Sequence, residues 1–233
     1  LHTHSNWSDG ENTIQEMAEA ARDLGYEYLG LCDHSQAVRI ANGLTPERLR
    51  SRNKAIDKLN AKSRGFRILK GIEVDIMKDG TLDFGDDLLA ELDVVVASVH
   101  SYFSLPEGEQ TRRLVAAIMN RQVHIIGHPT GRMLAQREAY PVNMTEVIRA
   151  AAGEGKALEL NAQPWRLDLP DVLLRQAGDA GVLISIDSDS HDRAQLALVR
   201  HAGVGLARRG WLGPEKILNA LSLPALLKKL SHK

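Results

Sequence analysis

The chain opens with two histidines and an aspartate whose spacing could support metal binding. The segment LHTHSNWSDG places His2 and His4 two residues apart, so both side chains point to the same side of an extended backbone. Asp9 follows in a turn that ends at Gly10. Imidazole nitrogens and carboxylate oxygens on one face are typical ligands of a shared divalent cation. A lone H-x-H pair is also common on solvent-exposed strands, so the other histidines decide the interpretation.

Most of the nine histidines stand at the ends of apolar, β-branched segments. This position is shared by His2, His4, His34, His100, His128 and His191. Two carboxylates fall in similar positions, Glu73 within GIEVD and Asp189 two residues before His191. Together with Asp9 and the six histidines, they would bring three carboxylates and six imidazoles into one pocket. Cations would offset the electrostatic repulsion within such a cluster. Two or three divalent metals would supply them, and this donor set suits Zn, Mn or Fe better than Ca or Mg.

Each of these residues also has an ordinary structural explanation. His34 could end a turn, and His100 and His128 could be buried, hydrogen-bonded histidines. Asp9 could form a turn and Asp189 could cap a helix. We favour the metal interpretation because all of them fall on the same predicted rim. No such role is predicted for three further histidines, His124, His201 and His232.

Apolar segments alternate with amphipathic ones along the chain, as in parallel β/α proteins. Seven strands are predicted, at residues 1–4, 28–34, 67–76, 94–100, 124–129, 157–162 and 182–191. Helices are predicted at residues 13–24, 45–63, 111–120, 143–152, 169–180 and 214–229. In a closed parallel barrel the carboxyl ends of all strands meet on one face. That geometry would gather the histidines around one pocket, so a barrel is favoured over an open sheet.

The composition indicates one domain. Its net charge does not by itself favour binding to nucleic acid or to a membrane surface. The 233 residues are 43% hydrophobic, and no Pro-, Gly- or Ser-rich linker divides them. The 29 basic and 30 acidic residues leave a net charge of −1. The single cysteine, Cys32, is typical of a reducing cytoplasm, and no apolar run reaches the roughly 18–20 residues of a membrane span. We therefore predict a cytoplasmic protein, and Leu1, inside a predicted strand, suggests a domain excised from a longer chain.

Seven motifs follow one another along the chain: HTHSNWSDG, DHS, GIEVD, SVHS, GHPTGR, ELN and SDSH. In this order they resemble the polymerase and histidinol phosphatase (PHP) domain family over essentially the whole chain. The segments ANGLTPERL, GTLDFGDDLLAELDVVVASVHS and LELNAQPWRLDLP more narrowly resemble the PHP domain at the C-terminus of bacterial family X DNA polymerases. The resemblance implies a single domain over residues 1–233. It also implies a distorted (β/α)7 barrel with a trinuclear metal site at the carboxyl ends of its strands.

Ligand sets are implied by the same resemblance. The first metal would be held by His2, His4, Glu73 and Asp189. The second would be held by Glu73, His100 and His128, and the third by Asp9, His34 and His191. Glu73 would therefore bridge two metals, and Glu73, Asp189 and His128 would act in catalysis. Asp9 departs from relatives that have histidine there, which gives the third site a harder ligand suited to Mn.

The implied chemistry is phosphoester hydrolysis by a metal-activated hydroxide, because clustered divalent metals lower the pKa of bound water and stabilise in-line displacement at phosphorus. No nucleophile elbow, Walker loop or dinucleotide fingerprint indicates another chemistry. The polymerase-like segments favour a 3′-5′ exonuclease, or 3′-end processing nuclease, that acts on DNA 3′ ends beside a repair polymerase domain in the same chain. One alternative is a small-molecule phosphomonoesterase of the histidinol-phosphate type. Another is a non-catalytic module, which the complete set of nine ligands disfavours.

Substrate contacts are predicted at three polar residues that follow strand ends, Arg132, Asn161 and Arg166. The two arginines could form forked bonds to a phosphate, and a surface salt bridge is the equal alternative. Asn161 would contact substrate or a metal-bound water. Asp33 would either orient the neighbouring imidazole of His34 or face a helix or the backbone.

Overall fold

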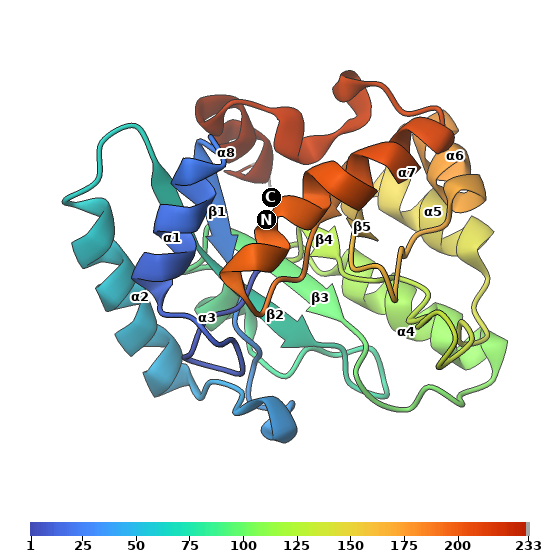
Figure 1. Ribbon diagram of the computed structural model, residues 1–233. Coiled ribbons are helices and arrows are strands. Elements are labelled where there is room, and N and C mark those ends of the chain that lie inside the picture. The colour runs from blue at the N-terminus through green and yellow to red at the C-terminus, as the bar shows by residue number, and fades with distance from the viewer. Residues whose placement is uncertain (232–233) are drawn as a thin grey trace.

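The computed structural model describes residues 1–231, in which six parallel strands follow one another in chain order around a curled sheet (Figure 1). The strands are β1 (Tyr28–Leu31), β2 (Arg67–Asp75), β3 (Val94–Ser98), β4 (Ile125–Ile126), β5 (Ala157–Asn161) and β6 (Ile184–Asp187). The α-helices are α1 (Ile14–Asp23), α2 (Pro46–Asn60), α3 (Asp86–Leu89), α4 (Glu107–Met119), α5 (Met144–Gly153), α6 (Asp171–Asp179), α7 (Val204–Arg209) and α8 (Leu223–Ser231). The predicted distorted parallel barrel is confirmed.

Residues 1–4, the first of the seven predicted strands, form only single-residue bridges to their neighbours. Thr3 pairs in parallel with Leu31 on one side and with Ser190 on the other. The amide of Cys32 donates to the carbonyl of Thr3 at 2.7 Å. The close approach depends on Gly30, where a Cβ atom would lie only 2.3 Å from the carbonyl oxygen of Leu1. The barrel is therefore closed by a short segment that also carries two of the predicted metal ligands.

Side chains alternate along each strand between an outer apolar core and the barrel interior. In β2, Ile72 and Val74 belong to the main core beneath the outer helices. Leu69 faces inward, where it packs with apolar strand residues and with Leu226 of α8. Further along the same inward face stands Glu73, which is fully buried. The interior is thus apolar where α8 closes it and polar at the carboxyl ends of the strands, where a charged cluster can form.

The local signals at the first helix are confirmed. Thr13 caps α1 through its hydroxyl, which accepts from the amide of Glu16 at 3.2 Å, and the Glu16 carboxylate accepts from the amide of Thr13 at 2.8 Å. Such a reciprocal capping box satisfies two amides that would otherwise lack partners. Within residues 1–231, no helix has both the length and the apolar surface required to traverse a bilayer.

The predicted helix over residues 214–229 is wrong in its first half. The chain instead forms two short 3-10 turns, Pro214–Lys216 and Leu218–Ala220, before α8 begins at Leu223. Between them, Ile217 pairs with Ile184 of β6. The Asn219 side chain accepts from the amide of Ile186 through Oδ1 at 3.0 Å and donates through Nδ2 to the carbonyl of Ile186 at 2.6 Å. This pairing with the edge of β6 replaces helical hydrogen bonds.

Candidate metal centre

All nine predicted ligands lie together at the carboxyl ends of the strands. Glu73, at the centre of this cluster, is fully buried. Its Oε1 atom lies 3.0 Å from His128 Nε2 and 3.3 Å from His100 Nε2. Its Oε2 atom lies 2.8 Å from His34 Nδ1 and 3.4 Å from His2 Nε2. One carboxylate thus faces imidazoles that come from four separate segments of the chain.

Three groups of donor atoms among the described residues are close enough to hold a cation, with each group's atoms within 4.8 Å of one another. They are His2, His4, Glu73 and Asp189; His4, Asp9, His34 and His191; and His34, Glu73 and His100. The first group coincides with the ligand set expected for the first metal. The second adds His4 to an expected set, and the third contains His34 where His128 was expected. Which metal each residue would hold stays a prediction.

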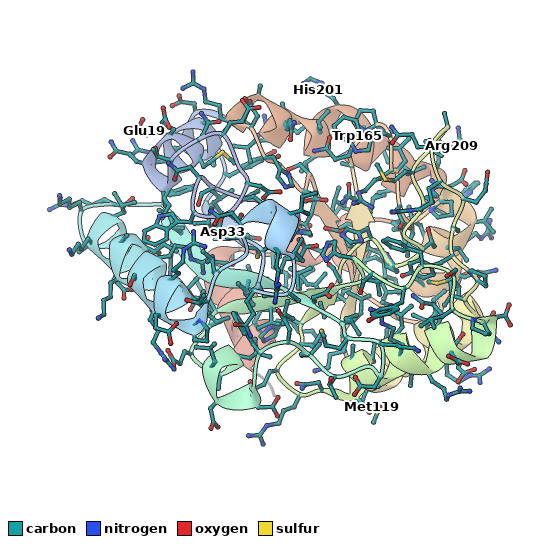
Figure 2. The ribbon with its side chains drawn as sticks, turned by 90° about the horizontal axis from the view of Figure 1, so that it is seen from below. Glu19, Asp33, Met119, Trp165, His201 and Arg209 are labelled. Carbon is teal, nitrogen blue, oxygen red and sulfur yellow. The ribbon has the colours of Figure 1, made fainter. Side chains whose placement is uncertain are left out.

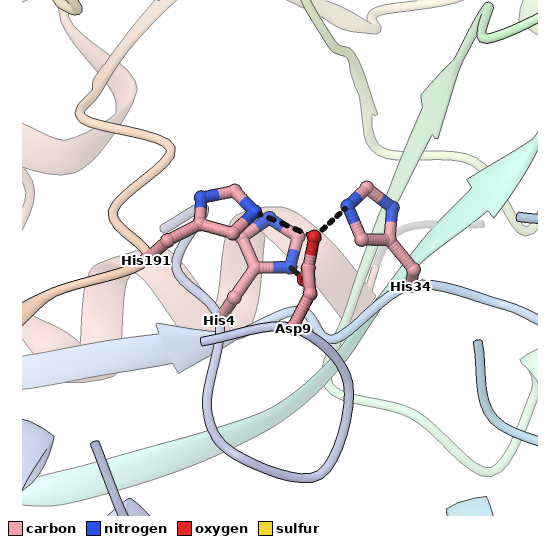
Figure 3. Close-up of side chains that lie close together, drawn as sticks. All are labelled: His4, Asp9, His34 and His191. Carbon is pink, nitrogen blue, oxygen red and sulfur yellow. Dashed lines mark ion pairs between the residues drawn. The ribbon is translucent and has the colours of Figure 1, made fainter. Parts of the chain in front are cut away.

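Asp9 lies between three imidazoles, as Figure 3 shows. Its Oδ2 atom is 3.3 Å from His191 Nε2 and 3.7 Å from His34 Nε2, and its Oδ1 atom is 4.0 Å from His4 Nδ1. Two ligands held at about 2.1 Å from one tetrahedral Zn lie roughly 3.4 Å apart. The two shorter separations in this group are close to that value, and two of the three are too long for hydrogen bonds, so the group could accommodate a cation.

Several buried donor atoms of the cluster lack hydrogen-bond partners within residues 1–231. These atoms are Glu73 Oε2, His4 Nδ1, His34 Nδ1 and His128 Nδ1. His34 Nδ1 and Glu73 Oε2 are only 2.8 Å apart, yet they do not meet in hydrogen-bonding geometry. A buried polar atom without a partner costs about 1–3 kcal/mol. Bound cations would remove that cost, so the donor set fits the metals that the sequence implies.

The electrostatics of the cluster keep two of its donors, Glu73 and His4, in the forms that bind metals. Burial opposes ionisation of Glu73, but the charges of His2 and His100 outweigh it and hold the pKa of that carboxyl well below its usual range. Burial and the neighbouring charge of His191 lower the pKa of His4 to about 4. At neutral pH the cluster therefore presents an ionised carboxylate and a neutral imidazole, the forms that bind metals.

Two buried carboxylates behind the cluster were not selected from the sequence. Glu159 Oε1 lies 2.6 Å from His2 Nδ1, and Asp75 Oδ1 lies 3.0 Å from His100 Nδ1. In both pairs the other imidazole nitrogen faces Glu73. A carboxylate in this position fixes the orientation of a ligand imidazole. Each stands two residues from a selected residue on the same strand face, which is the signal that could have identified it.

The three predicted substrate residues have different surroundings. Asn161 donates to Asp189 Oδ2 at 3.0 Å and is fully buried. Arg166 points at the cluster, with Nε 3.8 Å from Asp189 Oδ2, and its buried Nη1 has no hydrogen-bond partner in the described chain. Arg132 donates through Nε to the carbonyl of Arg166 at 3.0 Å and through Nη2 to that of Leu167. Arg132 thus fixes the loop that aims Arg166.

Asp33 holds the backbone of the first loop, and none of its hydrogen bonds within residues 1–231 is to an imidazole. Its Oδ1 atom accepts from the amide of Ser5 at 2.7 Å and from the hydroxyl of Ser8 at 3.0 Å. Its Oδ2 atom accepts from Arg52 Nη1 at 3.1 Å, and both charged side chains are fully buried. The ion pair therefore fixes the turn that carries Asp9.

Replacing Arg52 by methionine is expected to destabilise the protein by about 3–5 kcal/mol, because Asp33 would remain buried without its cation. The free energy of unfolding from urea titration measures this loss. The matched control is Arg50→Met, whose ion pair with Glu91 is half exposed and screened by solvent, so its loss should change stability little. An Arg52 variant no less stable than the Arg50 variant would contradict the assignment.

The remaining histidines lie away from the cluster or outside the described chain. His124 Nδ1 accepts from the amide of Val95, and Nε2 lies 3.0 Å from the carbonyl of Leu230 in α8. His201 is exposed and appears at the upper edge of the view in Figure 2. His232 lies outside the described residues.

Comparison with known proteins gives one family and several relatives. The family described as PHP domain matches residues 1–163. A Bacillus subtilis protein named DNA polymerase/3′-5′ exonuclease PolX is 49% identical over 96% of this chain, which spans only 39% of that relative. A protein named probable phosphatase from Syntrophotalea carbinolica is 30% identical over 94% of this chain and 90% of its own.

Among solved structures, histidinol phosphate phosphatase from Lactococcus lactis, complexed with Zn, L-histidinol and phosphate, superposes with a TM-score of 0.66. The match covers 91% of this chain and 93% of that one, at 19% sequence identity. A histidinol phosphatase from Listeria monocytogenes gives a TM-score of 0.65 at 16% identity, over 84% of this chain and 96% of its own. These two matches support the barrel fold.

Proposed function

This chain belongs to the PHP domain family, and on that premise we propose that it hydrolyses phosphodiester bonds at the 3′ ends of DNA as a 3′-5′ exonuclease. The observation that carries the proposal is the cluster of nine donor side chains around the buried carboxylate of Glu73. The 49% identity to a polymerase-associated exonuclease supports DNA as the substrate and a polymerase domain in the same parent chain. A DNA substrate would place the protein in the cytoplasm.

We propose that the cluster holds three divalent cations, Mn or Zn with Fe as a further option, on the ligand sets implied by the sequence. Bound cations of this kind lower the pKa of a coordinated water and stabilise negative charge on phosphate oxygens. Glu73, Asp189 and His128 would hold them nearest to the reacting phosphate. Glu159 and Asp75 would orient His2 and His100 through their second ring nitrogens.

Metal binding should strengthen as pH rises. Burial opposes protonation of His100, but Glu73 and Asp75 outweigh it and raise its pKa to about 10 in the metal-free chain. A metal must therefore displace this proton. The raised pKa of His100 stabilises the metal-free fold fully below about pH 6.5, and this contribution is lost as pH rises towards 10. The metal-induced rise in Tm should therefore be larger at pH 8.5 than at pH 6. Paired melting curves measure it, and a rise that shrinks with pH would contradict the assignment.

Arg166, whose side chain is 15% exposed beside Asp189, would bind the substrate phosphate through its guanidinium group. Its replacement by methionine is expected to lower kcat/KM on DNA by about 10–100-fold, because a charge-assisted hydrogen bond contributes about 1.5–3 kcal/mol. Metal content should not change. Arg208→Met, an exposed arginine on α7, is the control. Equal kinetics of the two variants would remove Arg166 from the substrate site.

A small-molecule phosphomonoesterase is the second candidate, supported by the relatives named probable phosphatase. Digestion of a 3′-labelled single strand, compared with release of phosphate from histidinol phosphate, separates the two. Both assays use Mn- and Zn-supplemented protein, with elemental analysis of the same sample. Cleavage of the oligonucleotide is expected; turnover of histidinol phosphate alone would favour the phosphatase. Inactivity of metal-loaded protein on both would favour a non-catalytic module.

A further inference from the structure

Two exposed aromatic side chains stand on loops that leave the carboxyl ends of β3 and β5, the edge of the sheet at which the metal centre lies. Tyr102 stands two residues after His100 and is 52% exposed. Trp165 directly precedes Arg166 and is 42% exposed. Aromatic residues make up only 4% of the chain, and these two uncovered rings on the rim that carries the charged cluster offer flat apolar surfaces to a ligand bound there.

The ring of Tyr102 forms one wall of an open hollow of about 420 Å³. The hollow is lined by Met77, Lys78, Asp79, Thr81 and Tyr102. The Lys78 ammonium lies 5.8 Å from the centroid of the Tyr102 ring. The loop is fixed from behind, because Arg113 donates to the carbonyl of Ser101 at 2.8 Å. The aromatic wall and the thioether suit a nucleobase, and the Lys78 ammonium suits its phosphate. The Asp79 carboxylate in the same hollow accepts from Thr81 Oγ1 at 2.7 Å.

Trp165 is held outward by a loop whose backbone is tied on several sides. Its carbonyl accepts from the amide of Leu134 at 2.5 Å. The next residue, Arg166, donates its amide to the carbonyl of Gln163 at 2.8 Å and accepts from Arg132 Nε at 3.0 Å. In Figure 2, Trp165 lies toward one edge of the viewed face and Asp33 nearer its middle. The indole is therefore presented in a fixed position next to the residue that points into the metal centre.

We propose that Tyr102 and Trp165 stack against unpaired bases next to the phosphodiester at the metal centre. Stacking of this kind tolerates any base sequence, because every base has a π-face. Bases inside a duplex do not expose those faces, so the preferred substrate is an unpaired 3′ strand. This inference rests on the proposed nuclease function and assigns two substrate-positioning residues to it.

The test compares three 3′-labelled oligonucleotides: a single strand, the same strand with abasic 3′-terminal nucleotides, and a blunt duplex. The Mn-loaded wild-type chain should cleave the base-bearing single strand with the lowest KM. Trp165→Ala and Tyr102→Leu should each raise that KM about 5–50-fold and reduce the preference over the abasic strand. Trp165→Phe and Tyr102→Phe should largely retain it. Trp211→Ala, which removes a 79% exposed tryptophan near Arg175, is the control.

A binding measurement gives an independent readout. The chain has three tryptophans, and an uncleavable phosphorothioate strand should quench less fluorescence in Trp165→Phe than in Trp211→Phe. Equal KM values for base-bearing and abasic strands, or equal quenching in both variants, would overturn the stacking proposal while leaving the nuclease function intact. Absence of cleavage of every oligonucleotide, with histidinol phosphate hydrolysed, would instead overturn the nuclease proposal.

Discussion

Glu73→Ala abolishes phosphoester hydrolysis and lowers the metal content of the purified chain, while leaving the fold intact, if the central carboxylate bridges two cations. Its two oxygens face separate imidazole groups, with Oε1 3.0 Å from His128 Nε2 and Oε2 2.8 Å from His34 Nδ1. No neighbouring carboxylate can replace both contacts. The loss of kcat/KM should therefore exceed the roughly 10–100-fold typical of residues that only orient a ligand.

The comparison that makes this result specific uses two further glutamates. Glu159→Gln keeps a hydrogen-bonding side chain beside His2 and should lose activity only within that 10–100-fold range. Glu154→Gln, at the exposed end of α5, should behave as wild type. Circular dichroism checks the fold, and elemental analysis counts the metals. Retained turnover with full metal content in Glu73→Ala would rule out the bridging role.

Removal of the metals is expected to abolish activity and to lower Tm by about 5–10 °C. Ligands at about 100 times Kd stabilise a fold by about 2.7 kcal/mol, and about 1 kcal/mol corresponds to roughly 2–4 °C in a protein of this size. The structural reason is that the donor atoms Glu73 Oε2, His4 Nδ1 and His34 Nδ1 are buried without hydrogen-bond partners in the described chain. Differential scanning calorimetry before and after chelation measures the shift.

Adding metals back to the chelated protein tests whether the loss of Tm and of activity is due to the metals. Mn or Zn, returned after removal of the chelator, should restore both Tm and hydrolysis, whereas Mg and Ca should restore neither at the same concentration. The choice follows from the donor set, in which imidazoles outnumber carboxylates. Full activity and an unchanged Tm in the chelated protein, verified as metal-free, would contradict a role for metals in either property.

The sequence placed the candidate ligands well because their positions depend on local patterns. His100 and His128 follow short runs of buried β-branched residues, and such runs end at a predictable edge of a parallel sheet. The supporting carboxylates Glu159 and Asp75 follow the same pattern, because each stands two residues from a predicted site residue on the same face of its strand. Their roles depend on which imidazole they meet, and that pairing is set by neighbouring strands.

Features set by tertiary contacts could not be predicted. The residues around Asn219 have helical composition, but the edge of β6 offers hydrogen bonds that outweigh helix formation. Arg132 and Arg166 both follow strand ends in the sequence. Only the structure distinguishes them. The Arg132 guanidinium donates to backbone carbonyls, whereas Arg166 has Nε 3.8 Å from Asp189 Oδ2 and a buried Nη1 without a hydrogen-bond partner among the described residues.

The narrow closure at Thr3 links the integrity of the sheet to the chemistry at its rim. A single bridge on each side joins residues 1–4 to the neighbouring strands, and the same four residues contribute two imidazoles to the cluster. Cations bound there would help to hold this short segment between the strands on either side. Loss of the metals would then weaken the attachment of residues 1–4 to the barrel. A metal-free chain would become both inactive and easier for proteases to cleave.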